Sequence, residues 1–175
     1  MLIYIEGLDK SGKSTFAKQL SVQLQVPIYR KMPPANLDLF EHHSYFKGVG
    51  FALMEIHNLL GLSVIVDRSF ISDWVYTNRN DDIRPLDIWK EWEGRHEKPH
   101  SVVIAYVEVP LAALEIRLSS APDPYMSLRD ASRFLALYEN YLGQTRFRLV
   151  RVSGIASTEE RSSELNTIEH MVRTF

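Results

Sequence analysis

The residues best equipped for chemistry lie near the N-terminus, in a glycine-rich segment from Gly7 to Ser14. The segment reads Gly-Leu-Asp-Lys-Ser-Gly-Lys-Ser and fills every fixed position of the phosphate-binding pattern G-x-x-x-x-G-K-[ST]. Glycines let successive backbone N–H groups point into one concavity, and the helix that follows presents its unpaired N-terminal donors to the same anion. The segment therefore predicts a phosphate-binding loop with the binding residues Gly7, Asp9, Lys10, Ser11, Gly12, Lys13, Ser14 and Thr15.

Two side chains of this loop have defined roles in the pattern. Lys13 reaches the β- and γ-phosphates of a nucleotide, and Ser14 places its hydroxyl on Mg²⁺. ATP and Mg²⁺ are therefore the expected ligands. Asp9 is harder to explain, because such a loop needs no acid and like charge beside a phosphate is unfavourable. A hydroxyl on the ligand would give Asp9 a partner.

A second charged pair, Asp67-Arg68, follows the most apolar segment of the chain, residues 63–66. An aspartate at the end of a buried strand can hold Mg²⁺ directly or through water. The planar guanidinium of Arg68 suits bidentate contact with a phosphate. The simpler alternatives are a helix N-cap for Asp67 and a surface ion pair for Arg68.

Three further arginines are candidates for phosphate contact. Arg117 and Arg129 flank a loop rich in serine and proline, as expected of a lid that brings cations over transferring phosphates. Arg30 ends a short apolar segment and would suit a dianionic acceptor. Solvated positions at helix or strand ends are the alternative for all three.

A flat nucleotide base offers a surface on which an aromatic ring can stack. Phe46, Phe51 and Trp74 lie in the segments on either side of Asp67 and are the candidates for this contact. For each of them singly, packing in the core is the simpler expectation.

The elements that must position these residues alternate along the chain. Apolar, β-branched segments predict strands at 2–5, 26–29, 63–66, 101–107 and 147–152. Helical periodicity falls between them and after the last, with one or two helices over 37–60, where two glycines interrupt the pattern. This alternation predicts a single α/β domain over residues 1–175, with a five-stranded parallel sheet, helices on both faces and a short lid at about 119–129. Ligands would bind at the carboxyl ends of the strands, where the loop and Asp67 both fall.

Composition narrows the class of partner. The chain of 175 residues is 45% hydrophobic and 24% charged with a net charge of −2, which gives no electrostatic reason to expect nucleic acid or an anionic membrane. Cysteine is absent, which excludes disulfides and cysteine metal sites. With no leader and no apolar run near the roughly 20 residues of a membrane span, the cytoplasm is the expected location. The expected partners are small nucleotides, and a homodimer is left open.

With Glu6-Gly7-Leu8-Asp9-Lys10-Ser11-Gly12-Lys13-Ser14-Thr15 and Asp67-Arg68-Ser69 both present, the sequence resembles the thymidylate kinase family of nucleoside monophosphate kinases. The resemblance implies the P-loop NTPase fold. It also implies that Asp9 faces the sugar 3′-hydroxyl of the acceptor, and that Asp67 and Arg68 serve Mg²⁺ and the acceptor phosphate. The implied reaction transfers the γ-phosphoryl group of ATP to a deoxynucleoside monophosphate, with dTMP as the first choice.

The sequence departs from that family at two places. Arg30-Lys31-Met32-Pro33-Pro34 stands where the family has an Arg-Glu-Pro-Gly-Gly type of loop, and residues 67–73 are also similar to the Glu-Arg-Ser…Ser-Asp signature of deoxynucleoside kinases. Those kinases phosphorylate a nucleoside and supply a glutamate as base just after the second strand. In this chain the first acid after the second predicted strand is Asp38. The lack of an earlier acid favours an acceptor that already carries a phosphate, although Asp38 or Glu41 could fold back as a base. A non-catalytic nucleotide-binding module is the third hypothesis.

Overall fold

The computed structural model describes residues 1–30, 39–77, 85–123 and 126–174. These residues form one five-stranded sheet in which every neighbouring pair of strands is parallel, with the order β2-β3-β1-β4-β5. The strand bounds are β1 Leu2–Glu6, β2 Ile28–Arg30, β3 Val64–Asp67, β4 Val102–Glu108 and β5 Arg148–Ser153.

Strand β1 lies at the centre of the sheet and is buried along its whole length. Its side chains alternate between two cores, because successive residues of a strand point to opposite faces. Leu2 and Tyr4 pack into one core, and Ile3 and Ile5 into the other. Burial on both faces explains why this strand reads as an uninterrupted apolar segment.

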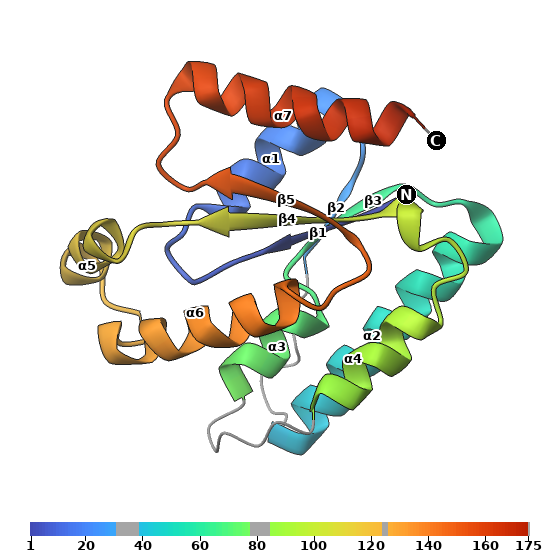
Figure 1. The fold of residues 1–175 in the computed structure, drawn as a ribbon, viewed down its shortest axis with the longest axis horizontal. Helices are drawn as coiled ribbons and strands as arrows, with labels where there is room; N and C mark the ends of the chain where they lie inside the picture. The colour runs from blue at the N-terminus through green and yellow to red at the C-terminus, as the bar shows by residue number, and fades with distance from the viewer. Residues whose placement is uncertain (31–38, 78–84, 124–125, 175) are drawn as a thin grey trace.

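The helices form a layer on each face of the sheet (Figure 1). Helices α1 (Lys13–Leu24) and α7 (Thr158–Arg173) cover one face, and α3 (Phe70–Thr77) and α6 (Leu128–Leu142) cover the other. Helices α2 (Leu39–Leu60) and α4 (Pro85–Gly94) lie side by side below the sheet, α5 (Leu111–Ser120) lies beyond the carboxyl end of β4, and a 3-10 turn (Pro99–Ser101) precedes β4.

Local sequence explains where the two C-terminal helices begin. Ser127 and Asp130 form a reciprocal capping box at the start of α6, and Ser157 and Glu160 form another at the start of α7. In each box the serine accepts an otherwise unpaired N–H, and the acid accepts the N–H of the serine. Within the described residues, no helix combines the length and the apolar character needed to cross a membrane.

The region that was expected to hold one or two helices is a single helix, α2. Gly50 lies on its inner face, where an added Cβ would stand 3.6 Å from the indole nitrogen of Trp92. That distance is an ordinary van der Waals contact, and a Cβ at Gly48 would meet nothing within 4 Å. Tertiary packing of the helix compensates for the low helix propensity of the two glycines.

Candidate active site

The phosphate-binding loop connects β1 to α1 at the carboxyl edge of the sheet. Gly7 has φ 134° and Gly12 has φ 103°, in the region that favours glycine. A Cβ at Gly7 would stand 2.5 Å from the carbonyl oxygen of Val107 in β4. Any other residue at position 7 would therefore push the loop away from the sheet.

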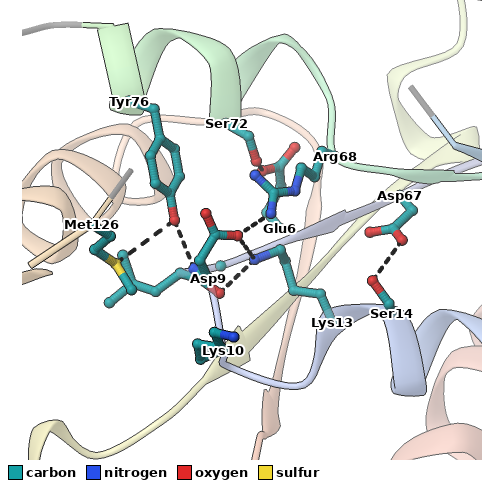
Figure 2. A network of polar contacts seen from close by, with 12 residues as sticks. Glu6, Asp9, Lys10, Lys13, Ser14, Asp67, Arg68, Ser72, Tyr76 and Met126 are labelled. Carbon is teal, nitrogen blue, oxygen red and sulfur yellow. Dashed lines mark hydrogen bonds and ion pairs between the residues drawn. The ribbon is translucent and has the colours of Figure 1, made fainter. Parts of the chain in front are cut away.

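Lys13 lies under this loop with only 4% of its surface exposed. Its ammonium group donates to the carbonyl of Leu8 and lies 3.6 Å from the Asp9 carboxylate (Figure 2). Burial, and then the positive charge of Arg68, lowers the pKa of Lys13 to about 8. The site therefore holds a cation that gains from the arrival of an anion.

Asp9 and Arg68 form an ion pair across the loop, and Figure 2 shows their side chains pointing toward each other. Asp9 is buried, whereas the Arg68 side chain keeps 43% of its surface exposed. The backbone N–H of Asp9 donates to the Tyr76 hydroxyl at 2.6 Å, which joins the loop to α3. Arg68 can thus contact a ligand while its carboxylate partner stays fixed.

Asp67 faces the start of α1 and the end of β2. One of its carboxylate oxygens, Oδ2, accepts the Ser14 hydroxyl at 2.9 Å and the Arg30 Nε–H at 3.2 Å. Its contacts are therefore to the loop helix and to β2, rather than to the start of α3 as an N-cap would require. The N–H of Ile71 in α3 donates instead to the Ser69 hydroxyl at 3.1 Å.

The chemistry of Ser14 and Asp67 fits a magnesium ion. The second carboxylate oxygen of Asp67, Oδ1, is buried and has no hydrogen-bond partner among the described residues, so it could coordinate a cation. The described residues contain no cluster of three or more metal-binding side chains. At a nucleotide site Mg²⁺ typically has only one or two protein ligands, and phosphates and water supply the rest of its coordination shell.

Arg117 lies on the other side of the loop from Arg68. From α5 its guanidinium donates to the carbonyl of Lys10 at 2.6 Å and to the carbonyl of Gly154 at 3.0 Å. These bonds join the phosphate loop to the turn after β5. A cavity of about 640 Å³ opens here, lined by residues that include Lys10, Thr15, Gln19, Arg117, Ser157 and Arg161. Arg129 lies in the first turn of α6 and is exposed.

The aromatic candidates have different positions. Trp74 is 3% exposed and packs in the core between α3 and the sheet, which is the simpler of the two expectations for it. Phe51 packs partly buried on α2, with the Arg95 guanidinium 4.5 Å from its ring centroid. The side chains of Phe46 and Glu41, and all of residues 31–38 with Lys31 and Asp38, lie outside the described residues.

Comparison with known proteins supports the fold. No protein-family model and no curated protein sequence matches the chain significantly. Among solved structures, the YorR protein of Bacillus subtilis, in complex with phosphorylated GDP, has a TM-score of 0.70 at 21% identity and covers 100% of this chain and 99% of its own. Deoxyadenosine kinase of M. mycoides, with dCMP and dCDP bound, has a TM-score of 0.64 at 17% identity, and the match covers 100% of both chains. Thymidylate kinase of Candida albicans has a TM-score of 0.62 at 19% identity, and the match covers 99% of this chain and 91% of that kinase.

The chain has the fold of the P-loop nucleotide kinases. The predicted fold class is confirmed, since the sheet is five-stranded, parallel and covered by helices on both faces. In this P-loop kinase fold, the phosphate loop, Asp67, Arg68 and Arg30 meet at one edge because the strands before them are neighbours in the sheet.

Sequence reasoning left out several residues of this site. Glu6 ends β1 with a fully buried carboxylate, and the argument that identified Asp67, a charge at the end of an apolar strand, applies to it equally. Tyr76 had no such signal. Arg133 lies one helical turn after Arg129 and, together with Tyr76 and Asp123, lines a cavity of about 650 Å³ beside the start of α6. The four-residue spacing between Arg129 and Arg133 could have identified Arg133, because residues four apart on a helix lie on the same face.

Proposed function

We propose that this P-loop kinase fold transfers the γ-phosphoryl group of ATP to a deoxynucleoside monophosphate, with dTMP as the first choice. The observation that carries the proposal is the arrangement around Lys13. Two half-exposed arginines, Arg30 and Arg68, are each paired with a buried aspartate beside the phosphate loop. The phosphate loop is enough to bind the phosphates of ATP alone. The additional pair of arginines suits the phosphate of a second substrate.

The donor nucleotide would bind on the Arg117 side of the loop, which we call the donor side. The loop amides and Lys13 would hold its β- and γ-phosphates, and the cavity beside Arg117 has room for the rest of the nucleotide. The bonds from Arg117 to Lys10 and Gly154 keep the outer wall of that cavity fixed before ATP arrives.

The acceptor would bind on the opposite side, between Arg68 and Arg30, which we call the acceptor side. Asp9, as the resemblance implies, would accept a hydrogen bond from the sugar 3′-hydroxyl. Both arginines could contact an acceptor phosphate, since Arg30 and Arg68 keep 46% and 43% of their side-chain surface exposed despite their ion pairs.

Phosphoryl transfer through a loose transition state needs charge neutralisation more than covalent help. Lys13 would act from below the transferring group and Arg68 from the acceptor side, and both positions are set by protein contacts before the substrates bind. Bound Mg²⁺ would neutralise charge on the β- and γ-phosphates, held through Ser14 and Asp67.

The state of the carboxylates favours a phosphate acceptor over a nucleoside. A nucleoside 5′-hydroxyl benefits from a general base, which must present an accepting oxygen to it. Among the described residues, Asp9 pairs with Arg68 and Lys13 and is assigned to the sugar 3′-hydroxyl, and Asp67 pairs with Ser14 and Arg30 and is assigned to Mg²⁺. Glu6 is fully buried, so none of these carboxylates is assigned to a 5′-hydroxyl. The charged oxygen of a monophosphate needs no base.

A deoxynucleoside kinase is the second candidate. Its support is the whole-chain likeness to the deoxyadenosine kinase of M. mycoides, together with the serine that follows Asp67-Arg68. It would need a base from Asp38 or Glu41, whose side chains lie outside the described residues. A nucleotide-binding module without transfer is the third candidate, and the presence of acceptor-side cations argues against it.

The experiment is an ADP-release assay coupled to a spectroscopic readout, run with ATP and Mg²⁺ and with dTMP, thymidine or no acceptor. We expect rapid release with dTMP and at most slow release in the other two reactions. Release that is independent of the acceptor would support the module, and release only with thymidine would support the nucleoside kinase. The Lys13→Ala variant controls for contaminating ATPases.

A further inference from the structure

Glu6 is a buried carboxylate for which neither a substrate nor Mg²⁺ supplies a role. It is the last residue of β1, has no exposed surface, and has no ion pair within 4 Å among the described residues. Hydrogen bonds compensate its burial instead. One oxygen accepts the Ser69 N–H at 2.7 Å, and the other accepts the hydroxyl of Ser72 and lies 3.3 Å from that of Tyr138.

These contacts surround Arg68, whose backbone is unusual. Arg68 has φ 73°, in the left-handed region that residues with a side chain rarely adopt. Its own N–H donates to the Ile5 carbonyl at 3.2 Å, and the next N–H, that of Ser69, donates to Glu6. Both acceptors belong to the end of β1, so the strand holds the strained residue on both sides.

The same carboxylate also connects α3 and α6 to the phosphate loop. The Tyr138 hydroxyl lies 3.0 Å from that of Ser72 and donates to the Gly7 carbonyl at 3.2 Å. Burial, and then the charge of Glu6, raises the pKa of Tyr138 well above its ordinary value, so this hydroxyl keeps its proton. Figure 2 shows Ser72 and Glu6 meeting directly behind Arg68.

We infer that Glu6 is a positioning residue that fixes the backbone of Arg68, and through it the guanidinium that faces Asp9 and the acceptor. The inference rests on the proposed function for its kinetic consequence, but not for its structural one. Glu6 touches neither substrate, so its effect on transfer must pass through Arg68.

The Glu6→Gln variant tests this with little change in size. Its amide oxygen can still accept the Ser69 N–H, but the charge that strengthens this bond is lost. We expect acceptor kcat/KM to fall about tenfold, with the Kd for ADP within about twofold of the unmutated protein. In an Arg68→Ala background, Glu6→Gln should change kcat/KM by less than about twofold, because the guanidinium through which Glu6 acts is absent.

Glu93→Gln is the matched control. Glu93 is likewise a buried carboxylate with several donors, those of Tyr141, Thr145 and the Arg146 N–H, but it lies on α4 and makes no contact with Arg68 in the described structure. It should lower the melting temperature without changing the KM for acceptor or kcat. Ser72→Ala is the milder second variant, should Glu6→Gln fail to fold, and is expected to act in the same direction as Glu6→Gln.

A readout without turnover separates this inference from the proposed function. The side-chain Nε–H resonance of Arg68 is assigned by its loss in Arg68→Lys, and we expect it to shift or broaden in Glu6→Gln and Ser72→Ala but not in Glu93→Gln. An unchanged Arg68 resonance in Glu6→Gln and Ser72→Ala, or an undiminished tenfold effect in the Arg68→Ala background, would overturn the positioning role. If the unmutated protein transfers no phosphate, the proposed function fails and the resonance still decides the role of Glu6.

Discussion

The arginines on the two sides of the phosphate loop differ in what they bind. Arg117, on the donor side, donates to two backbone carbonyls, whereas Arg68 and Arg30, on the acceptor side, contact carboxylates and keep nearly half of their side-chain surface exposed. Backbone carbonyls are neutral and belong to the loops that Arg117 joins, so Arg117 acts as a structural support. A carboxylate-paired arginine can bind a phosphate with its free edge while its partner holds it in place. Under the proposed function, a preset donor side would therefore face an acceptor side that can bind a second anion.

Removal of Lys13 should have the largest effect, because this residue serves the group that passes between the two sides. We expect Lys13→Ala to lower kcat by at least about 10³-fold, since the variant loses the buried loop cation that the proposed function places against the transferring phosphates. Steady-state kinetics measures the loss, and thermal unfolding should show a folded protein. Turnover near that of the unmutated protein would refute the phosphate-loop assignment.

Arg68→Ala should have the next largest effect and should be confined to the acceptor side. We expect acceptor kcat/KM to fall about 10²-fold with the Kd for ATP almost unchanged, because Arg68 acts where charge develops on the transferring group. Calorimetry for ATP and initial rates for dTMP separate the two effects. An equal loss of ATP affinity would show that the two sides are not distinct.

The pH dependence should distinguish the same arginines. Lys13, with a pKa of about 8 in the free protein, is charged below that pH and neutral above it. We expect kcat/KM for ATP to fall by about tenfold per pH unit above pH 8, since this parameter reports groups of the free enzyme. Arg68 lowers the pKa of Lys13, so Arg68→Ala should move the decline to higher pH, while Arg117→Ala should leave it in place. A shift of equal size in both variants would contradict the distinction between the two sides.

Arg117→Ala should have the smallest effect. Losing two hydrogen bonds to backbone carbonyls loosens the wall of the donor cavity, and we expect the KM for ATP to rise about 3- to 10-fold with acceptor KM unchanged. Initial rates at varied ATP measure it. A large loss of kcat would instead give Arg117 the lid role that its position beside a serine- and proline-rich loop suggested.

The fold could be predicted from sequence because its signals are local. Each strand is a short apolar segment, and the loop pattern places a helix after the first strand. The route of Arg117 to Lys10 and Gly154 could not be predicted, because it depends on how α5 packs beyond the sheet. The left-handed backbone of Arg68 was also hidden, since its contacts with β1 join residues that are far apart in the sequence.

The central claim is that the acceptor already carries a phosphate, and the most direct test compares kcat/KM for dTMP and thymidine in the unmutated protein and in Arg30→Ala. Arg30 contacts Asp67 at 3.1 Å and keeps 46% of its side-chain surface exposed. We predict that the unmutated protein prefers dTMP, and that Arg30→Ala reduces this preference about tenfold by lowering the rate with dTMP alone. A preference for thymidine in the unmutated protein, or a preference for dTMP that survives Arg30→Ala undiminished, would contradict the account.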